Sequence, residues 1–186
     1  RRSRYMHHDL LNLLHTYLRK PLAGDEADMA QLTIDFVHAH TDCLHRTCLT
    51  GHITGSAWVV DPTHTWALLT HHRKLDRWFQ PGGHADGDPD LLAVAMREAR
   101  EETGVAGVHP VSPAIFDVDR HWIPERGDEP GHWHHDLRFL LEADRDAPLV
   151  VSSESKDLAW VALDDLPRYN GEQSIVRMAR KTRLLC

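Results

Sequence analysis

The strongest constraint on this chain is a glycine pair, Gly82-Gly83, that precedes a helix-forming run ending in a cluster of carboxylates. Glu98, Glu101 and Glu102 stand at i, i+3 and i+4, so an α-helix would place them on one face with Cβ atoms about 5–6 Å apart. Like charges at this spacing repel, and the C-terminal end of a helix is unfavourable for anions. A hard cation such as Mg²⁺ would offset both effects, because it prefers oxygen ligands. The pattern therefore predicts a metal site.

The limits of this helix can also be predicted. Asp88 is a good N-cap residue, and Pro89 is tolerated at the first helical position, where no N–H is needed. Gly104 suits the left-handed residue that commonly follows a helix. We expect a helix over residues 89–103.

This stretch resembles the box of the Nudix hydrolases, G-x5-E-x7-R-E-U-x-E-E-x-G-U, in which U is an apolar residue. The matching positions are Gly83, Arg97, Glu98, Ala99, Glu101, Glu102, Gly104 and Val105. The one departure is Pro89, where the family has a glutamate. The preceding residues 78–84 also resemble the strand that leads into the box.

The resemblance implies a MutT-like enzyme that hydrolyses a diphosphate bond in a nucleoside diphosphate linked to another moiety. It also implies Mg²⁺ or Mn²⁺ as cofactor, held by Glu98, Glu101, Glu102 and the backbone of Gly82. In the family, the box arginine usually ties to the first glutamate. We therefore expect Arg97 to use an aspartate from the loop before the helix. The candidates are Asp86, Asp88 and Asp90.

The catalytic base is expected among the glutamates, and family members often recruit it from outside the box. The candidates are Glu102, Glu125, Glu129 and Glu154. Glu154 lies just before an apolar strand at Trp160, in a segment that resembles the C-terminal part of the family. The expected catalytic set is Glu101, Glu102, Arg97 and Glu154.

Several residue types suit binding of a nucleotide. Arg73 and Lys74 follow an apolar strand and could hold phosphates, or could form a solvated hairpin tip. Gly83 allows close approach of the backbone, and Trp133 could stack on a nucleobase or belong to the core. The expected substrate-binding set is Arg73, Lys74, Gly83, His84 and Trp133.

Histidines 132, 134 and 135 cluster at the start of a strand, and could line the pocket or bind a metal. Alternation along a strand sends His132 and His134 to one face and His135 to the other.

The remaining pattern predicts a mixed β-sheet between helices. We expect helices at 9–18, 26–40 (capped by Asp25) and 173–184, a hairpin of strands at 51–61 and 66–70, and later strands at 114–118, 137–141 and 160–163. The resemblance implies the same α/β/α sandwich, over approximately residues 50–185. We divide the chain into an α-helical extension, residues 1–48, packed on the core, and a Nudix domain, residues 49–186. The apolar stripes of the extension could also pair two copies in a homodimer.

Composition bounds the partners and the compartment. A net charge of −7 disfavours extended nucleic acid, and no apolar run is long enough to span a bilayer. The cysteines are Cys43, Cys48 and Cys186, and this odd number without a secretory leader favours the cytoplasm. Cys43 and Cys48 could bind zinc with His45 and His52, but buried free thiols are the simpler interpretation.

Three alternatives stay open. The chain could be a Nudix-like module that binds a nucleotide with little turnover, an idea motivated by Pro89 and the N-terminal helices. It could be an isopentenyl-diphosphate isomerase, although Cys43 and Cys48 precede the box in no matching motif. A coenzyme A pyrophosphatase is suggested only by Leu68-Leu69-Thr70, with altered spacing afterwards.

Overall fold

The computed structural model describes residues 6–185, so Cys186 lies outside the described residues. Its helices are α1 His8–Leu18, α2 Glu26–Ala39, α3 Leu91–Thr103, α4 Leu166–Tyr169 and α5 Gln173–Arg183, with a 3₁₀ turn at Leu163–Asp165. Its strands are β1 Gly51–Val60, β2 Trp66–His72, β3 Arg77–Phe79, β4 Gly82–His84, β5 His109–Pro110, β6 Asp117–Ile123, β7 His132–Glu142 and β8 Ser155–Ala162.

These strands form one mixed sheet. The main order is β3-β2-β1-β7-β5, while β4 pairs with β1, β6 with β7 and β8 with β2. Strands β1 and β7 run parallel from the pair Gly51–Trp133 to the pair Val60–Glu142, and the other pairs are antiparallel. The predicted hairpin is present, but β1 and β2 pair at Val60–Ala67 and then separate toward different partners.

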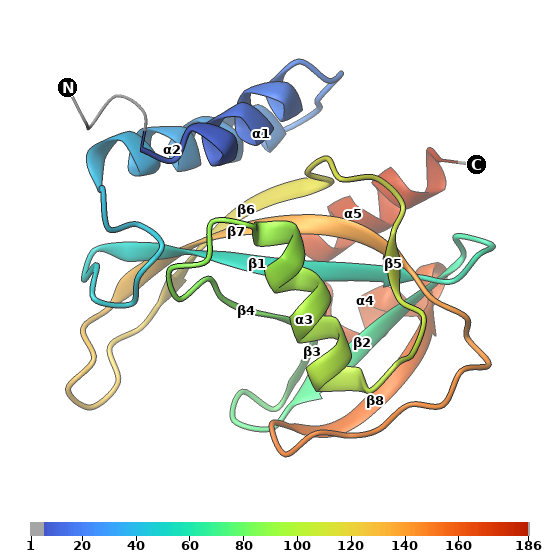
Figure 1. The fold of residues 1–186 in the computed structure, drawn as a ribbon. Helices are drawn as coiled ribbons and strands as arrows, with labels where there is room; N and C mark the ends of the chain where they lie inside the picture. The colour runs from blue at the N-terminus through green and yellow to red at the C-terminus, as the bar shows by residue number, and fades with distance from the viewer. Residues whose placement is uncertain (1–5, 186) are drawn as a thin grey trace.

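Helices cover both faces of the sheet, with α3 on one side and α5 on the other (Figure 1). Alternation along β1 sends Ile53, Ala57 and Val59 into one apolar cluster, and Trp58 and Val60 into a second. The first cluster joins the sheet to α1, α2 and α3, and the second joins it to α4 and α5. The expected α/β/α sandwich with helices at the N-terminus is thereby confirmed.

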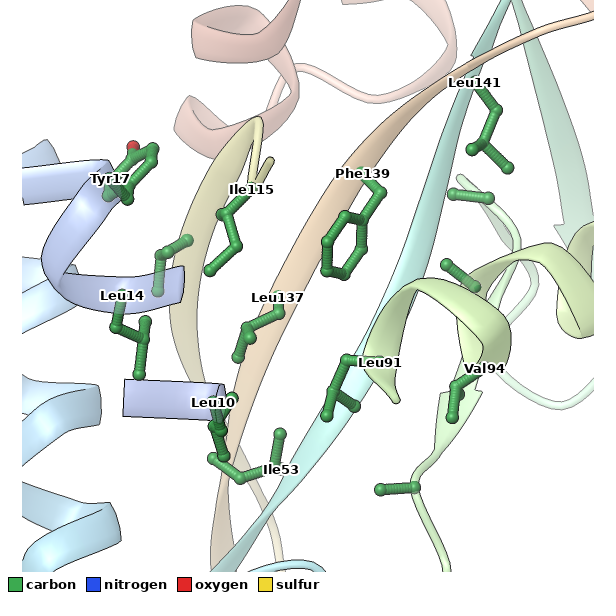
Figure 2. Packing of buried hydrophobic residues seen from close by; sticks show 14 of the residues in the cluster. Leu10, Leu14, Tyr17, Ile53, Leu91, Val94, Ile115, Leu137, Phe139 and Leu141 are labelled. Carbon is green, nitrogen blue, oxygen red and sulfur yellow. The ribbon is translucent and has the colours of Figure 1, made fainter. Parts of the chain in front are cut away.

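The N-terminal helices and α3 contribute side chains to the same apolar cluster. Figure 2 shows side chains of α1, α3, β1 and β7 in one cluster, among them Leu10, Leu14, Leu91, Val94, Ile53, Leu137 and Phe139. Leu14 and Leu91 are fully buried, and full burial of such a side chain stabilises the fold by roughly 1.5–3 kcal/mol. The α1–α2 segment is therefore part of what stabilises the sheet that carries β1 and β7.

A buried ionic network joins β6 and β7 to α5. Asp117 is fully buried and accepts hydrogen bonds from Arg138 at 3.3 Å and from Arg177 at 2.8 Å. Burial alone would raise the pKa of Asp117, but the hydrogen bonds from Arg177 and the nearby positive charges bring this pKa below its ordinary value. Arg138 also donates to Asp136 at 2.9 Å, and Asp136 in turn accepts from Ser56 on β1. This network was not foreseen, because its members come from separate strands and from α5 and become neighbours only through strand pairing and the packing of α5 on the sheet.

Three expected features differ in detail. The strand expected at 114–118 is β6, which runs from Asp117 to Ile123 because it pairs along β7 from Arg138 to His132. The strand expected at 160–163 begins earlier, at Ser155, where it pairs with His72 of β2. Asp25 occupies the N-cap of α2 without a capping hydrogen bond, since its carboxylate contacts Arg177 at 3.4 Å.

Within residues 6–185, no helix combines the length and the apolar character that a membrane crossing would require.

Candidate active site

Helix α3 lies against β1 and β4 (Figure 1), and capping residues fix where it begins and ends. The Asp90 carboxylate accepts a hydrogen bond from the Ala93 N–H at 3.0 Å, and Gly104 adopts the left-handed conformation with φ 64°. The expected cap at Asp88 was wrong, and the helix begins at Leu91 rather than at 89. Asp88 instead accepts a hydrogen bond from the Asp90 N–H at 2.9 Å, which orients the capping residue.

The carboxylates of α3 meet the glycine pair on β4. A side-chain carbon at Gly83 would lie 2.6 Å from the carboxyl carbon of Glu98, so only glycine leaves room for that carboxylate. The Gly82 N–H donates to Glu102 at 3.4 Å. Glu98 is half-buried and Glu102 is buried, whereas Glu101 is exposed on the same helix.

The surroundings of Glu98 and Glu102 make it unfavourable for both carboxyl groups to be ionised. Burial, followed by the charge of Glu98, raises the pKa of Glu102 to about 8. Burial also raises the pKa of Glu98, and the two carboxyl groups are hydrogen-bonded to each other. Clustered, desolvated oxygen donors of this kind fit Mg²⁺ or Mn²⁺, since a hard cation would replace the proton that the pair otherwise retains.

Glu154 comes from the loop before β8. After burial and the charge of a nearer glutamate, its charge is a smaller cause of the raised pKa of Glu98 and of Glu102. The expected place of Glu154 in the catalytic set stays a prediction. The guanidinium group of Arg73 donates to the carbonyls of Ser153 and Ser155, at 3.1 and 3.2 Å, and the Arg73 N–H donates to the Glu154 carbonyl at 3.0 Å. Arg73 thus fixes the backbone that carries Glu154, while Lys74 is exposed at the same turn.

Three aspartates hold the loop before α3, and each has a different partner. Arg97 contacts Asp88 at 3.7 Å. Of the three aspartates expected as possible partners of Arg97, Asp88 therefore has that role. Asp86 forms a two-point contact with Arg46, at 2.8 and 2.9 Å, and Asp90 caps the helix. Arg46 lies in the segment before β1, and nothing in its local sequence marks it as a partner of this loop.

The neighbours of His84 and Trp133 are aromatic and basic side chains rather than the carboxylates of α3. His84 sits beside His52 and His134, and burial, then Arg46, lowers its pKa to about 4. Trp133 lies under the guanidinium group of Arg120, at 4.0 Å from the ring centre, and against Trp122.

The alternation expected for the later histidines is confirmed. His132 and His134 contact each other and His52 on one face of β7, while His135 stacks on Phe36 of α2 on the opposite face. The position of His52 was not foreseen, because the sequence suggested Cys43 and Cys48 as its neighbours.

Cys43 and Cys48 are free, buried cysteines, as expected. Burial raises the pKa of Cys43 to about 12, so this group stays a thiol.

Comparisons with known proteins agree with the resemblance of the box. A model of the NUDIX domain matches residues 52–181, which is more than half of the chain. No curated protein matches the sequence. The expected division into an extension at 1–48 and a domain at 49–186 stays a prediction.

Solved structures share the fold at low identity. An Ap4A hydrolase from C. elegans is 16% identical, with a TM-score of 0.58 over 72% of this chain and 96% of that one. A NUDIX-family hydrolase from Clostridium perfringens is 22% identical, with a TM-score of 0.54 over 73% and 98%. The E. coli dihydroneopterin triphosphate pyrophosphohydrolase is 13% identical, with a TM-score of 0.58 over 72% and 96%. At these identities the likeness establishes the fold.

Proposed function

Because the chain belongs to the Nudix hydrolase family, we propose that it cleaves the diphosphate bond of a nucleoside diphosphate linked to another moiety, with Mg²⁺ or Mn²⁺ as cofactor. The observation that carries this proposal is the contact of Glu98 and Glu102 with each other beside Gly82-Gly83. The two carboxylates gain a favourable partner only when a cation joins them.

The proposed metal ligands are Glu98, Glu101, Glu102 and the backbone of Gly82. A divalent ion held there would neutralise charge on the phosphate oxygens and lower the pKa of a bound water. Glu101 is exposed on the same helix, so its side chain can turn toward the Glu98–Glu102 pair, and a bound cation would offset the solvent that its carboxylate loses.

We assign Glu154 the role of general base. It is exposed, it lies close enough to affect both box carboxylates, and it belongs to a different element from the metal ligands. A base on a separate loop can reach a water on the open side of the metal site. Arg73 acts as a positioning residue for this loop through its contacts with the Ser153 and Ser155 carbonyls.

The replacement of the family glutamate by Pro89 does not remove the loop brace in this interpretation. Asp88 supports Arg97, and the Arg46–Asp86 pair adds a second attachment from the segment before β1. The N-terminal segment, residues 1–48, would thus serve the active site as well as the core.

The substrate class is proposed from the site and from the names of similar proteins. The neighbours include proteins described as an Ap4A hydrolase and as a dihydroneopterin triphosphate pyrophosphohydrolase, and a NUDIX domain complexed with ADP ribose. We propose a small nucleotide-type diphosphate as partner, with Lys74 near its phosphates and Trp133 near its base. His84, which the sequence suggested for the phosphates, instead packs beside His52 and His134, on the side of β4 opposite to the carboxylates. We also propose a cytoplasmic location, and we leave the homodimer as an alternative role for α1 and α2.

A hydrolysis screen tests this proposal. The full chain is incubated with Mg²⁺ or Mn²⁺ and with nucleotide sugars, ADP-ribose, dinucleoside polyphosphates, nucleoside triphosphates and coenzyme A, and products are resolved by ion-exchange chromatography. Cleavage at a diphosphate bond that stops with EDTA is the expected result. Saturable binding of a nucleotide without any cleavage would favour the non-catalytic module instead.

A further inference from the structure

We propose a second metal site, formed by His52, His132 and His134, that takes a divalent transition metal of the Zn²⁺ type. The ligand atoms of the three histidines all lie within 4.8 Å of one another. His134 Nε2 is 3.1 Å from His52 Nε2 and 3.1 Å from His132 Nε2. Imidazole nitrogens at about 2.0–2.1 Å from a tetrahedral Zn²⁺ stand about 3.3 Å apart. The two contacts of His134 already have nearly this spacing, and the His52–His132 pair lies within 4.8 Å.

The strand pairing brings these side chains together. His52 on β1 is the register partner of His134 on β7, and His132 lies two residues earlier on the same face of β7. His52 and His132 are each about 3% exposed, so the three rings meet at the protein interior rather than on an open surface. Two adjacent strands therefore fix the spacing without the help of a flexible loop.

The proton count also argues for a cation. His132 Nδ1 lies 2.9 Å from the Pro130 carbonyl, and a carbonyl only accepts, so Nδ1 carries the hydrogen and Nε2 carries a lone pair. That lone pair faces His134 Nε2, which also faces His52 Nε2. One hydrogen on His134 serves only one of these two contacts well. A cation at the centre would use all three lone pairs at once.

One ring already has the hydrogen bond that usually orients a ligating histidine from outside the metal, because the Pro130 carbonyl accepts from His132 Nδ1 at 2.9 Å.

The donor set selects the class of metal. Three imidazoles favour Zn²⁺ and related transition metals, whereas Mg²⁺ prefers oxygen ligands. A carboxylate oxygen of Glu129 lies 3.8 Å from His132 Nε2 on the exposed side, where a fourth ligand or a water would complete the site. Three protein nitrogens and one open position is the arrangement of many zinc sites.

This site is distinct from the box carboxylates. Gly83 faces Glu98 of α3, whereas the next residue, His84, packs beside His52 and His134. Successive residues of a strand point to opposite faces, so the two groups of ligands lie on opposite sides of β4. The histidine site therefore stands or falls independently of diphosphate hydrolysis.

Co²⁺ and Zn²⁺ binding to the full chain tests the proposal. Excess Mg²⁺ is present throughout to occupy the carboxylates, and binding is followed by the visible spectrum of Co²⁺ and by competition with a Zn²⁺ indicator. We expect one equivalent of each metal, with the intense absorption of four-coordinate Co²⁺. His134→Asn should weaken binding by at least about 100-fold, more than loss of an outer-shell partner does.

The matched control is His121→Asn, which removes an exposed neighbour of His134 outside the proposed ligand set. It should bind as the wild type does. Circular dichroism checks folding of each variant, and His132→Asn replaces His134→Asn if the latter does not fold. The proposal is overturned if the wild type binds no stoichiometric Co²⁺ or Zn²⁺, if the ligand variants bind normally, or if His121→Asn loses binding equally.

Discussion

Replacing Glu102 with glutamine should make the metal-free protein more stable at alkaline pH. The pKa of this carboxyl is raised from 4.5 to about 8 in the folded protein. Between these values the folded chain holds a proton that the unfolded chain has released. The free energy of unfolding of the wild type therefore falls as pH rises through this window. Glutamine carries no charge and removes this loss.

The magnitude follows from the same shift. A pKa that moves from 4.5 to about 8 corresponds to at most roughly 5 kcal/mol, because each pKa unit is about 1.4 kcal/mol. Relaxation of the Gly82-Gly83 segment and entry of water lower this cost, so we expect about 2 kcal/mol of difference between pH 5 and pH 9.

Urea unfolding in EDTA, followed by tryptophan fluorescence at pH 5, 7 and 9, measures this difference. Glu101→Gln is the matched control: it removes an exposed carboxylate one residue away, whose charge acts on Glu98, and it should change the pH dependence much less than Glu102→Gln does. Added Mg²⁺ or Mn²⁺ should stabilise the wild type at pH 9 more than at pH 5, because the ionised pair binds the cation. Parallel stability curves for wild type and Glu102→Gln would refute the argument that Glu102 is destabilised by burial and by Glu98.

Two further predictions concern packing. Gly83→Ala places a methyl carbon 2.6 Å from the Glu98 carboxyl carbon, so kcat of the hydrolysis should fall about 10-fold or more, with folding retained. The control is Gly171→Ala, whose added carbon meets only a backbone oxygen at 3.5 Å and which should retain normal kcat. Equal rates for both variants would contradict the close fit between Gly83 and Glu98. Asp117→Ala removes the fully buried carboxylate that two buried arginines share and should cost about 3–5 kcal/mol of unfolding free energy, although Asp119 still contacts both arginines. Asp164→Ala, in an exposed ion pair, should cost less than about 1 kcal/mol. Urea denaturation compares the latter pair, and a small loss for Asp117→Ala would mean that the network contributes little.

Much of the local structure could be predicted because it depends on neighbours along the chain. The left-handed Gly104 follows from backbone chemistry, and the carboxylates share one helix through their spacing alone. The turn expected at Gly82-Gly83 was wrong, because both residues pair with β1 as part of strand β4. The helix start was misplaced by two residues, because Asp88 and Asp90 are equally good caps and only the hydrogen bond to Ala93 decides between them.

Contacts between distant segments could not be predicted from local pattern. Arg46 contacts Asp86 because the segment before β1 packs on the box loop. His52 contacts His134 because β1 pairs with β7. The place of Glu154, whose charge acts on the box carboxylates, depends likewise on the pairing of β8 with β2. The resemblance to the family indicated Glu154, whereas the periodicity of the sequence did not.

The most direct test of the central claim compares initial rates of wild type, Glu102→Gln and Glu154→Gln on the diphosphate cleaved fastest in the screen. Glu125→Gln, in an exposed loop, is the control. We expect Glu102→Gln to lose at least about 100-fold in kcat/KM and to need more Mg²⁺ or Mn²⁺, and Glu154→Gln to lose kcat by at least about 100-fold at unchanged metal requirement. Wild-type rates in folded Glu102→Gln and Glu154→Gln would contradict the assignment of this site as a diphosphate hydrolase.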